Sequence, residues 1–246
     1  MNTLPNPADR KTVVVLLAMC LPLALSACAS ASADVNPTQA SSVIPAPTQP
    51  PSALATAPAS LPPGTQSWVL ASDGNQASYR VREQLANRSL PSDAVGTTTN
   101  VSGKLALGAD GQPIPAASSF SVDLTGLRSD AGGRDRYVRQ NTLQTDSYPK
   151  AEFTPKTVQG LPSPLPTSGK VTFELIGDLT IHGVTKPATW NVTADVKGQE
   201  LTGAATTTFT FSDFGMQVPR VFVVLSVEDK IQLEYDFRLV PASSGS

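Results

Sequence analysis

The stretch Val227-Glu228-Asp229-Lys230-Ile231-Gln232-Leu233-Glu234-Tyr235-Asp236-Phe237-Arg238-Leu239 alternates apolar and polar side chains almost without a break. Only Asp229 interrupts the apolar series. Successive side chains of a β-strand point to opposite faces, so this alternation gives one dry face and one wet face. Such a pattern is typical of antiparallel sheets. The stretch therefore predicts an all-β, antiparallel fold.

The same alternation recurs in five segments upstream of this stretch. They are residues 79–81, 120–124, 171–181, 190–196 and 207–211. In the segment 171–181 only Ile176 departs from the pattern. Several of the predicted strands are about 10 to 14 residues long, and long twisted strands curl toward closure. We therefore predict an antiparallel barrel of about eight strands.

Turn chemistry separates the predicted strands. Glycine suits the positive φ that hairpin turns require, and it occurs in Asp73-Gly74, Asp110-Gly111, Ser168-Gly169 and Lys197-Gly198. Residues 132–143 depart from the strand pattern and predict one short helix. The barrel strands should thus be joined mainly as hairpins, with a single helical insertion.

The amino-terminal residues have the features of an export signal. A basic pair, Arg10-Lys11, precedes an apolar run that ends in Leu25-Ser26-Ala27-Cys28, which is typical of a lipoprotein processing site. The run is shorter than the roughly 20 apolar residues of a membrane-spanning helix. We predict a signal peptide over residues 1–27 and lipid attachment at Cys28. An ordinary secretory signal, cut beside the same small residues, is the alternative, and both export the protein.

Composition divides the remaining chain into three parts. Residues 28–63 are rich in Pro, Ala, Ser and Thr and predict an extended tether. Residues 64–240 have the size of one domain, and residues 241–246 predict a disordered tail. The formal net charge of −2 arises from interspersed charges without a basic stripe, which argues against nucleic acid as a partner. With Cys20 and Cys28 both outside this domain, no disulfide or thiolate metal site is expected.

Three motifs, in this order, resemble the YceI-like family over most of residues 67–240. The first is Gly133-Arg134-Asp135-Arg136-Tyr137-Val138-Arg139 followed by Thr145-Asp146-Ser147-Tyr148-Pro149-Lys150-Ala151-Glu152-Phe153. The second, and most specific, is Gly177-Asp178-Leu179-Thr180-Ile181-His182-Gly183-Val184-Thr185-Lys186-Pro187. The third is Phe211-Ser212-Asp213-Phe214-Gly215-Met216. The resemblance implies an exported bacterial domain with a lipocalin-like barrel that holds an isoprenoid lipid.

An eight-strand barrel can hold one small ligand if side chains do not fill it. Its predicted inner face is apolar and aromatic, and the same side chains could instead form a filled core. The resemblance to the family favours a ligand, such as a long-chain isoprenoid lipid or quinone. The candidate cavity wall consists of Tyr79, Val81, Phe120, Val122, Phe173, Leu175, Trp190, Val192, Phe209, Phe211, Leu233, Tyr235 and Phe237.

Polar residues of the motifs are candidates for the barrel mouth. Arg134, Asp135 and Arg136 could meet a polar head group, or belong to a helix that seals the barrel end. His182, the single histidine, lies beside Gly183, which favours a turn residue that satisfies backbone groups. A metal would need further His or Cys ligands, so we predict no metal site. No Ser has a nucleophile-elbow sequence, and we predict no enzyme activity.

Together these features predict an exported, membrane-tethered protein of the cell envelope that sequesters or carries a long apolar ligand in its barrel. No further cofactor is expected. The alternative is a filled barrel that acts as an envelope scaffold or protein-interaction module. The apolar residues 217–224 could form a sticky edge, an additional strand or a lip over the cavity.

Overall fold

The computed structural model describes residues 61–242 of the chain. The predicted signal peptide, Cys28, most of the tether and residues 243–246 lie outside the described residues. The described part belongs to one compact unit that begins at residue 56. Its core and its sheet are complete within that unit, which therefore has what a domain needs to fold on its own.

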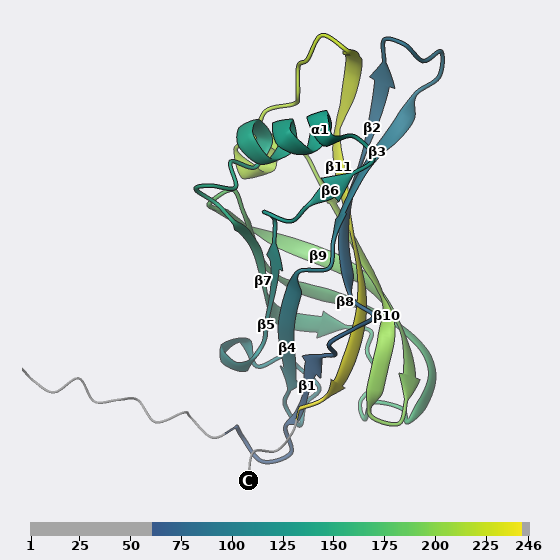
Figure 1. The fold of residues 1–246 in the computed structure, drawn as a ribbon. Helices are drawn as coiled ribbons and strands as arrows, with labels where there is room; N and C mark the ends of the chain where they lie inside the picture. Colours follow the sequence, from purple (N-terminus) through teal and green to yellow (C-terminus); the bar gives the residue numbers. More distant parts are fainter. Residues whose placement is uncertain (1–60, 243–246) are drawn as a thin grey trace, which may run out of the picture. The chain divides into compact units, whose positions relative to one another are not determined.

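The fold is built from antiparallel strands, as the alternation predicted. Eight of them close a barrel in the order β1-β4-β5-β7-β8-β9-β10-β11, because β11 also pairs with β1 (Figure 1). The all-β, eight-stranded lipocalin-like barrel expected from the sequence is confirmed. The strands of the barrel are β1 (Gln66–Leu70), β4 (Val101–Leu107), β5 (Ser119–Asp123), β7 (Lys150–Gln159), β8 (Ser168–Ile181), β9 (Val184–Lys197), β10 (Glu200–Phe209) and β11 (Val224–Pro241).

Three further strands extend the barrel at one end. They are β2 (Gln76–Leu85), β3 (Ser92–Thr98) and β6 (Arg128–Ser129). The first part of β11 pairs with β2 and its last residues pair with β1, so β2 prolongs the line of β1 along the same strand. Figure 1 shows the β2–β3 hairpin rising beyond the closed part of the barrel.

A helical segment lies at the same end of the barrel (Figure 1). It comprises α1 (Gly132–Tyr137) and a π-helical turn, η2 (Val138–Thr142), in the place where one short helix was predicted. Arg139 Nη1 donates to the carbonyl of Leu127 at 2.9 Å and ties the segment to the loop between β5 and β6. Single 3-10 turns, η1 (Pro115–Ala117) and η3 (Phe211–Phe214), complete the helical elements of the described part of the chain. Within residues 61–242 no helix is long and apolar enough to cross a membrane.

The two breaks in the predicted alternation have structural reasons. At Asp229 the pairing of β11 with β2 shifts register, and the carboxylate accepts a hydrogen bond from the backbone N–H of Phe211 at 2.8 Å. Asp229 thus anchors the start of η3 instead of facing the core. Ile176 lies opposite Thr157, beside a register shift between β7 and β8, while its neighbour Leu175 stays buried.

The four predicted turn glycines, Gly74, Gly111, Gly169 and Gly198, all have positive φ angles. Strands β1, β3 and β4 are absent from the sequence prediction, and in β3 and β4 the inward positions include small or polar residues. In β3 the buried inward residues are Ala94, Gly96 and Thr98, which carry no hydrophobic alternation. Strand β11 continues to Pro241, one residue past the predicted domain boundary, where it pairs with Trp68.

Candidate ligand cavity

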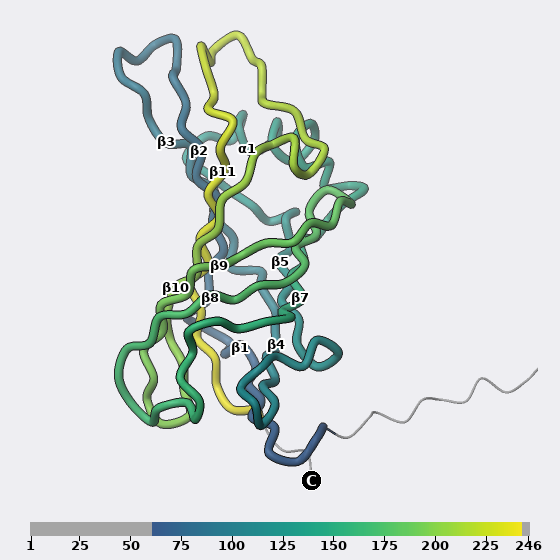
Figure 2. Tube along the Cα trace, turned by 180° about the vertical axis from the view of Figure 1, so that it is seen from behind, coloured from purple at the N-terminus to yellow at the C-terminus, as the bar shows by residue number. Residues whose placement is uncertain are grey.

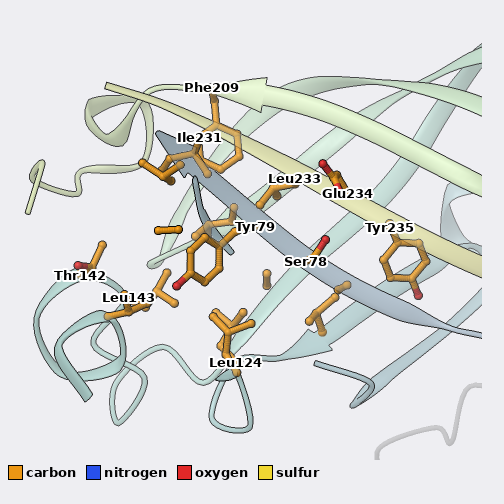
Figure 3. A pocket seen from close by; sticks show the side chains of 18 of the residues that line it. Ser78, Tyr79, Leu124, Thr142, Leu143, Phe209, Ile231, Leu233, Glu234 and Tyr235 are labelled. Atoms are coloured by element: carbon orange, nitrogen blue, oxygen red, sulfur yellow. The ribbon is translucent and has the colours of Figure 1, made fainter. Parts of the chain in front are cut away.

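The barrel encloses a cavity of about 810 Å³, a size typical of small-molecule sites. The inner faces of the strands form its wall, and the helical segment contributes Arg134, Val138 and Thr142. In Figure 3 the labelled side chains Tyr79 from β2, Leu233 from β11 and Leu143, which directly follows the helical segment, face one common space. The inward side chains therefore leave a hollow in the middle of the barrel.

All thirteen side chains predicted for the wall lie along this one cavity, whichever strand they come from. They are Tyr79, Val81, Phe120, Val122, Phe173, Leu175, Trp190, Val192, Phe209, Phe211, Leu233, Tyr235 and Phe237.

Aromatic contacts run around the wall. The rings of Phe120 and Tyr235 meet edge to face at 6.2 Å between centroids, and those of Phe153 and Trp190 at 5.9 Å. Phe153, on β7, also lines the cavity but was not among the predicted wall residues. It lies two residues after Ala151 in the family motif, and this spacing places both side chains on the same face of the strand. Edge-to-face pairs hold rings in defined positions, so the wall keeps its shape.

Tyr79 occupies a place that a glycine opens for it. A Cβ at Gly96, directly opposite on β3, would lie 2.3 Å from the Tyr79 ring. The ring therefore packs against the backbone of β3 at Gly96, in space that a side chain would otherwise fill. Burial raises the pKa of the Tyr79 hydroxyl to about 12, although the Arg134 guanidinium partly opposes that shift.

Two wall residues carry buried polar atoms with no hydrogen-bond partner among residues 61–242: Trp190 Nε1 and the Tyr235 hydroxyl. Burial raises the pKa of the Tyr235 hydroxyl above its ordinary value, so this group is a neutral donor. Buried donors without an acceptor are costly, by about 1–3 kcal/mol each. The otherwise apolar wall thus contains unused hydrogen-bonding capacity.

An ion cluster marks the cavity mouth beside α1. Arg134 Nη2 lies 2.6 Å from Glu83 Oε1, and Arg134 Nη1 donates to the exposed carboxylate of Asp130. Burial lowers the pKa of the Arg134 guanidinium, but its bonds and charges with Asp130 and Glu83 outweigh this effect and raise the pKa. Glu83 was not predicted. It lies two residues after Val81 and four after Tyr79 on β2, so the alternation in the sequence already placed it on the same inward face.

Of the four residues predicted at the mouth, only Arg134 lines the cavity. Asp135 is buried and accepts hydrogen bonds from the backbone N–H and hydroxyl of Ser129, at 2.7 and 2.6 Å, which fastens α1 to β6. Arg136 is exposed. The structure thus assigns these two residues to the attachment and outer surface of the helix, not to the cavity.

His182 lies at the tip of the β8–β9 hairpin with a φ of 52°. Its ring packs edge to face on Tyr148 at 4.7 Å, and Nδ1 lies 3.2 Å from the carbonyl oxygen of Phe214. This placement matches the turn role that Gly183 suggested and keeps the imidazole outside the cavity lining.

Three roles were open for the segment 217–224, and its residues 217–223 form a loop that leads into β11. Pro219, Val221 and Val223 of this loop line the cavity. It therefore forms a lip at the mouth, and Val224 begins the strand.

A closed antiparallel barrel with an apolar cavity and a helix across one end defines a lipocalin-like barrel. The YceI-like domain model matches residues 68–239, and the chain belongs to the YceI-like family. The resemblance seen in the sequence motifs is thereby confirmed.

Curated relatives match part of the chain. A UPF0312 protein of Pseudomonas putida strain W619 is 36% identical over 114 residues, 43% of this chain and 56% of the relative. A UPF0312 protein of Shewanella baltica strain OS185 is 30% identical over 131 residues, 50% of this chain and 64% of the relative. The chain thus spans less than two thirds of the length of these relatives.

Among solved structures, a polyisoprenoid binding domain from Saccharophagus degradans, implicated in plant cell wall breakdown, covers 72% of this chain and 99% of its own. It has a TM-score of 0.54 at 9% identity, so the likeness is one of fold. BcnA of Burkholderia cenocepacia covers 67% of this chain and 95% of its own, with a TM-score of 0.48 at 18% identity.

Proposed function

We propose that this protein binds a long isoprenoid lipid in its barrel and carries it outside the cytoplasm, without catalysing a reaction. The observation that carries this proposal is the cavity of about 810 Å³ with an apolar, aromatic wall. The fold is shared with a domain from Saccharophagus degradans described as polyisoprenoid binding, which supports the same ligand class here.

The apolar wall supplies enough free energy for binding. Burial of ~500 Å² of an isoprenoid tail contributes about 12 kcal/mol at ~25 cal/mol per Å². Loss of translational and conformational freedom removes a large part of this gain. Affinities in the micromolar range or tighter remain within reach, which is sufficient for a carrier.

The polar groups favour a ligand with an uncharged head over a phosphate. Arg134 already contacts the carboxylates of Glu83 and Asp130, so its charge is neutralised by the protein itself. Trp190 Nε1 and the Tyr235 hydroxyl are buried donors in the cavity wall without a partner among residues 61–242, so an acceptor oxygen on the ligand would satisfy them. A carbonyl oxygen fits this requirement, and we therefore favour an isoprenoid quinone.

The direct test is to purify residues 56–246 from the native host, extract the protein with organic solvent and identify bound lipids by mass spectrometry. A stoichiometric isoprenoid is the expected result. Protein that remains folded, yields no lipid and takes up no added isoprenoid would contradict the proposal. It would then favour the scaffold alternative.

Fluorescence separates the ligand classes. In a Trp68→Phe variant Trp190 is the only tryptophan, and it lies in the cavity wall, whereas Trp68 does not. An isoprenoid quinone should quench Trp190 emission when it binds. A polyprenol or polyprenyl phosphate, added to the quinone complex, should restore the emission only at a higher concentration than the quinone needed to quench it. The Trp190→Phe variant, with Trp68 as the remaining tryptophan, is the matched control and should respond much less. Equal quenching in both variants would exclude Trp190 from the binding site.

We also propose that lipidated Cys28 and the Pro-rich residues 28–63 hold the barrel beside a membrane, on its extracytoplasmic side. Two or more acyl chains, at about 0.8 kcal/mol per buried CH₂, make such attachment long-lived. The Cys28→Ala variant should move from the membrane fraction to the soluble fraction. Unchanged fractionation of this variant would contradict anchoring at Cys28.

A further inference from the structure

The barrel end beside α1 carries an exposed apolar tip, defined here as residues 86–91 between β2 and β3 together with residues 219–226 before and at the start of β11. Figures 1 and 2 show both segments projecting at this end, opposite the described termini. Phe222 is fully exposed, Leu90 is 75% exposed, Leu225 68% and Val223 63%. These are the four most exposed large hydrophobic side chains of residues 61–242. A cluster of exposed large hydrophobic side chains is typical of an interaction surface.

The two segments of the apolar tip form one connected surface. The backbone N–H of Ala86 donates to the carbonyl of Val223 at 3.0 Å, and Val224 pairs with Leu85 in the sheet. Pro219 and Val221, from the same loop, line the cavity. An apolar surface therefore runs from the outside of the tip into the barrel interior.

The charges of the apolar tip are of one sign. Residues 86–91 and 219–226 contain two arginines, Arg88 and Arg220, both exposed, and no Asp or Glu. Apolar side chains next to basic ones suit the interface of an anionic bilayer, where the former enter the acyl boundary and the latter meet head groups. A symmetric contact between two copies would instead bring like charges together.

From these observations we infer that the apolar tip docks on anionic lipid bilayers and inserts Phe222 and Leu225 into the interface. The cavity mouth then opens onto the acyl region, where an apolar ligand can pass between bilayer and barrel without crossing water. The use of this docking for ligand exchange rests on the proposed function, whereas the docking itself does not.

Vesicle co-sedimentation of residues 56–246, which omit Cys28 and the signal, tests the docking. Vesicles of phosphatidylglycerol and phosphatidylcholine should bind the protein, and vesicles of phosphatidylcholine alone should bind it more weakly. The double variant Phe222→Ser/Leu225→Ser should lose at least tenfold in affinity, since two large apolar side chains no longer enter the interface. The variant Leu61→Ser changes an exposed apolar residue outside the tip and is the matched control.

The basic residues have a separate signature. Each of Arg88→Gln and Arg220→Gln should reduce binding about fivefold on anionic vesicles, and less on neutral ones. A Phe222→Trp variant should shift its emission to shorter wavelength when anionic vesicles are added. These vesicles contain no isoprenoid, so an empty cavity in the extraction experiment would leave this result unaffected.

Three outcomes would overturn the inference. The first is absence of binding to anionic vesicles by folded protein, and the second is equal binding by wild type and Phe222→Ser/Leu225→Ser. The third is a dimer in analytical ultracentrifugation that this double variant dissociates, without vesicle binding. That result would assign the apolar tip to contact between copies of the chain.

Discussion

Replacement of Arg134 by Met should destabilise the barrel more than removal of an exposed ion pair. Arg134 Nη2 lies 2.6 Å from Glu83 Oε1, and the side chains of Arg134 and Glu83 are only 18% and 8% exposed. Loss of one partner leaves a buried carboxylate uncompensated, which costs about 3–5 kcal/mol. Because the Arg134 site is partly open to solvent, we expect the lower end, about 3 kcal/mol.

Urea unfolding, followed by circular dichroism, measures this loss in residues 56–246. The matched control is Lys156→Met, which removes an equally short ion pair, 2.6 Å from Asp178, whose side chains are 52% and 38% exposed. It should cost less than about 1 kcal/mol. The double variant Glu83→Leu/Arg134→Met should recover most of the stability, because no unpaired charge remains buried. The reasoning would be refuted if Arg134→Met cost no more than Lys156→Met, or if the double variant were as unstable as the single one.

Three other changes test the interior of the barrel. Burial raises the pKa of Tyr79 from 10.0 to about 12, so the folded protein disfavours the phenolate. The free energy of unfolding should therefore fall by roughly 2–3 kcal/mol as pH rises from about 10 to 12. Unfolding measured across this pH range should show a smaller fall in the Tyr79→Phe variant. Gly96→Ala should cost about 1–3 kcal/mol, since its Cβ would overlap the Tyr79 ring; a stability equal to wild type in urea unfolding would show that the ring moves freely. Ala205→Leu adds three carbon atoms to the cavity wall, so isoprenoid uptake should fall while the free energy of unfolding stays nearly unchanged. Ala106→Leu, which is buried outside the cavity, should instead reduce the free energy of unfolding by about 1–3 kcal/mol. Equal losses of stability in both variants would mean that the barrel is filled.

The alternation along the strands could be read from the sequence, and the side chains that it assigned to the inner face line the cavity. The alternation in residues 227–239 predicted β11, and the inward set Leu233, Tyr235 and Phe237 lines the cavity. Strand β3 was missed because its inward residues are small or polar, and at Gly96 the Tyr79 ring lies where a Cβ would be. A residue selected by its neighbour on another strand leaves no periodic signal of its own.

The mouth was predicted less well. Arg134, Asp135 and Arg136 are adjacent in sequence, but an α-helical turn directs them to different surroundings: the cavity, a hydrogen-bonded site at Ser129, and solvent. The partner of Arg134 inside the mouth is Glu83, 51 residues away. Local pattern could not assign that partner.

The antiparallel sheet and the inward side of the strands with regular alternation can be inferred from the sequence, because a period of two follows from backbone geometry. The family can be inferred as well, because its motifs are continuous stretches of chain. The hollow between the inward faces, the contact of Glu83 with Arg134 at its mouth, and the exposed tip that Leu90 and Phe222 share emerge only from the three-dimensional fold. These features join segments far apart in the chain. They depend on the closure of β11 onto β1 and on its pairing with β2, which no local pattern encodes.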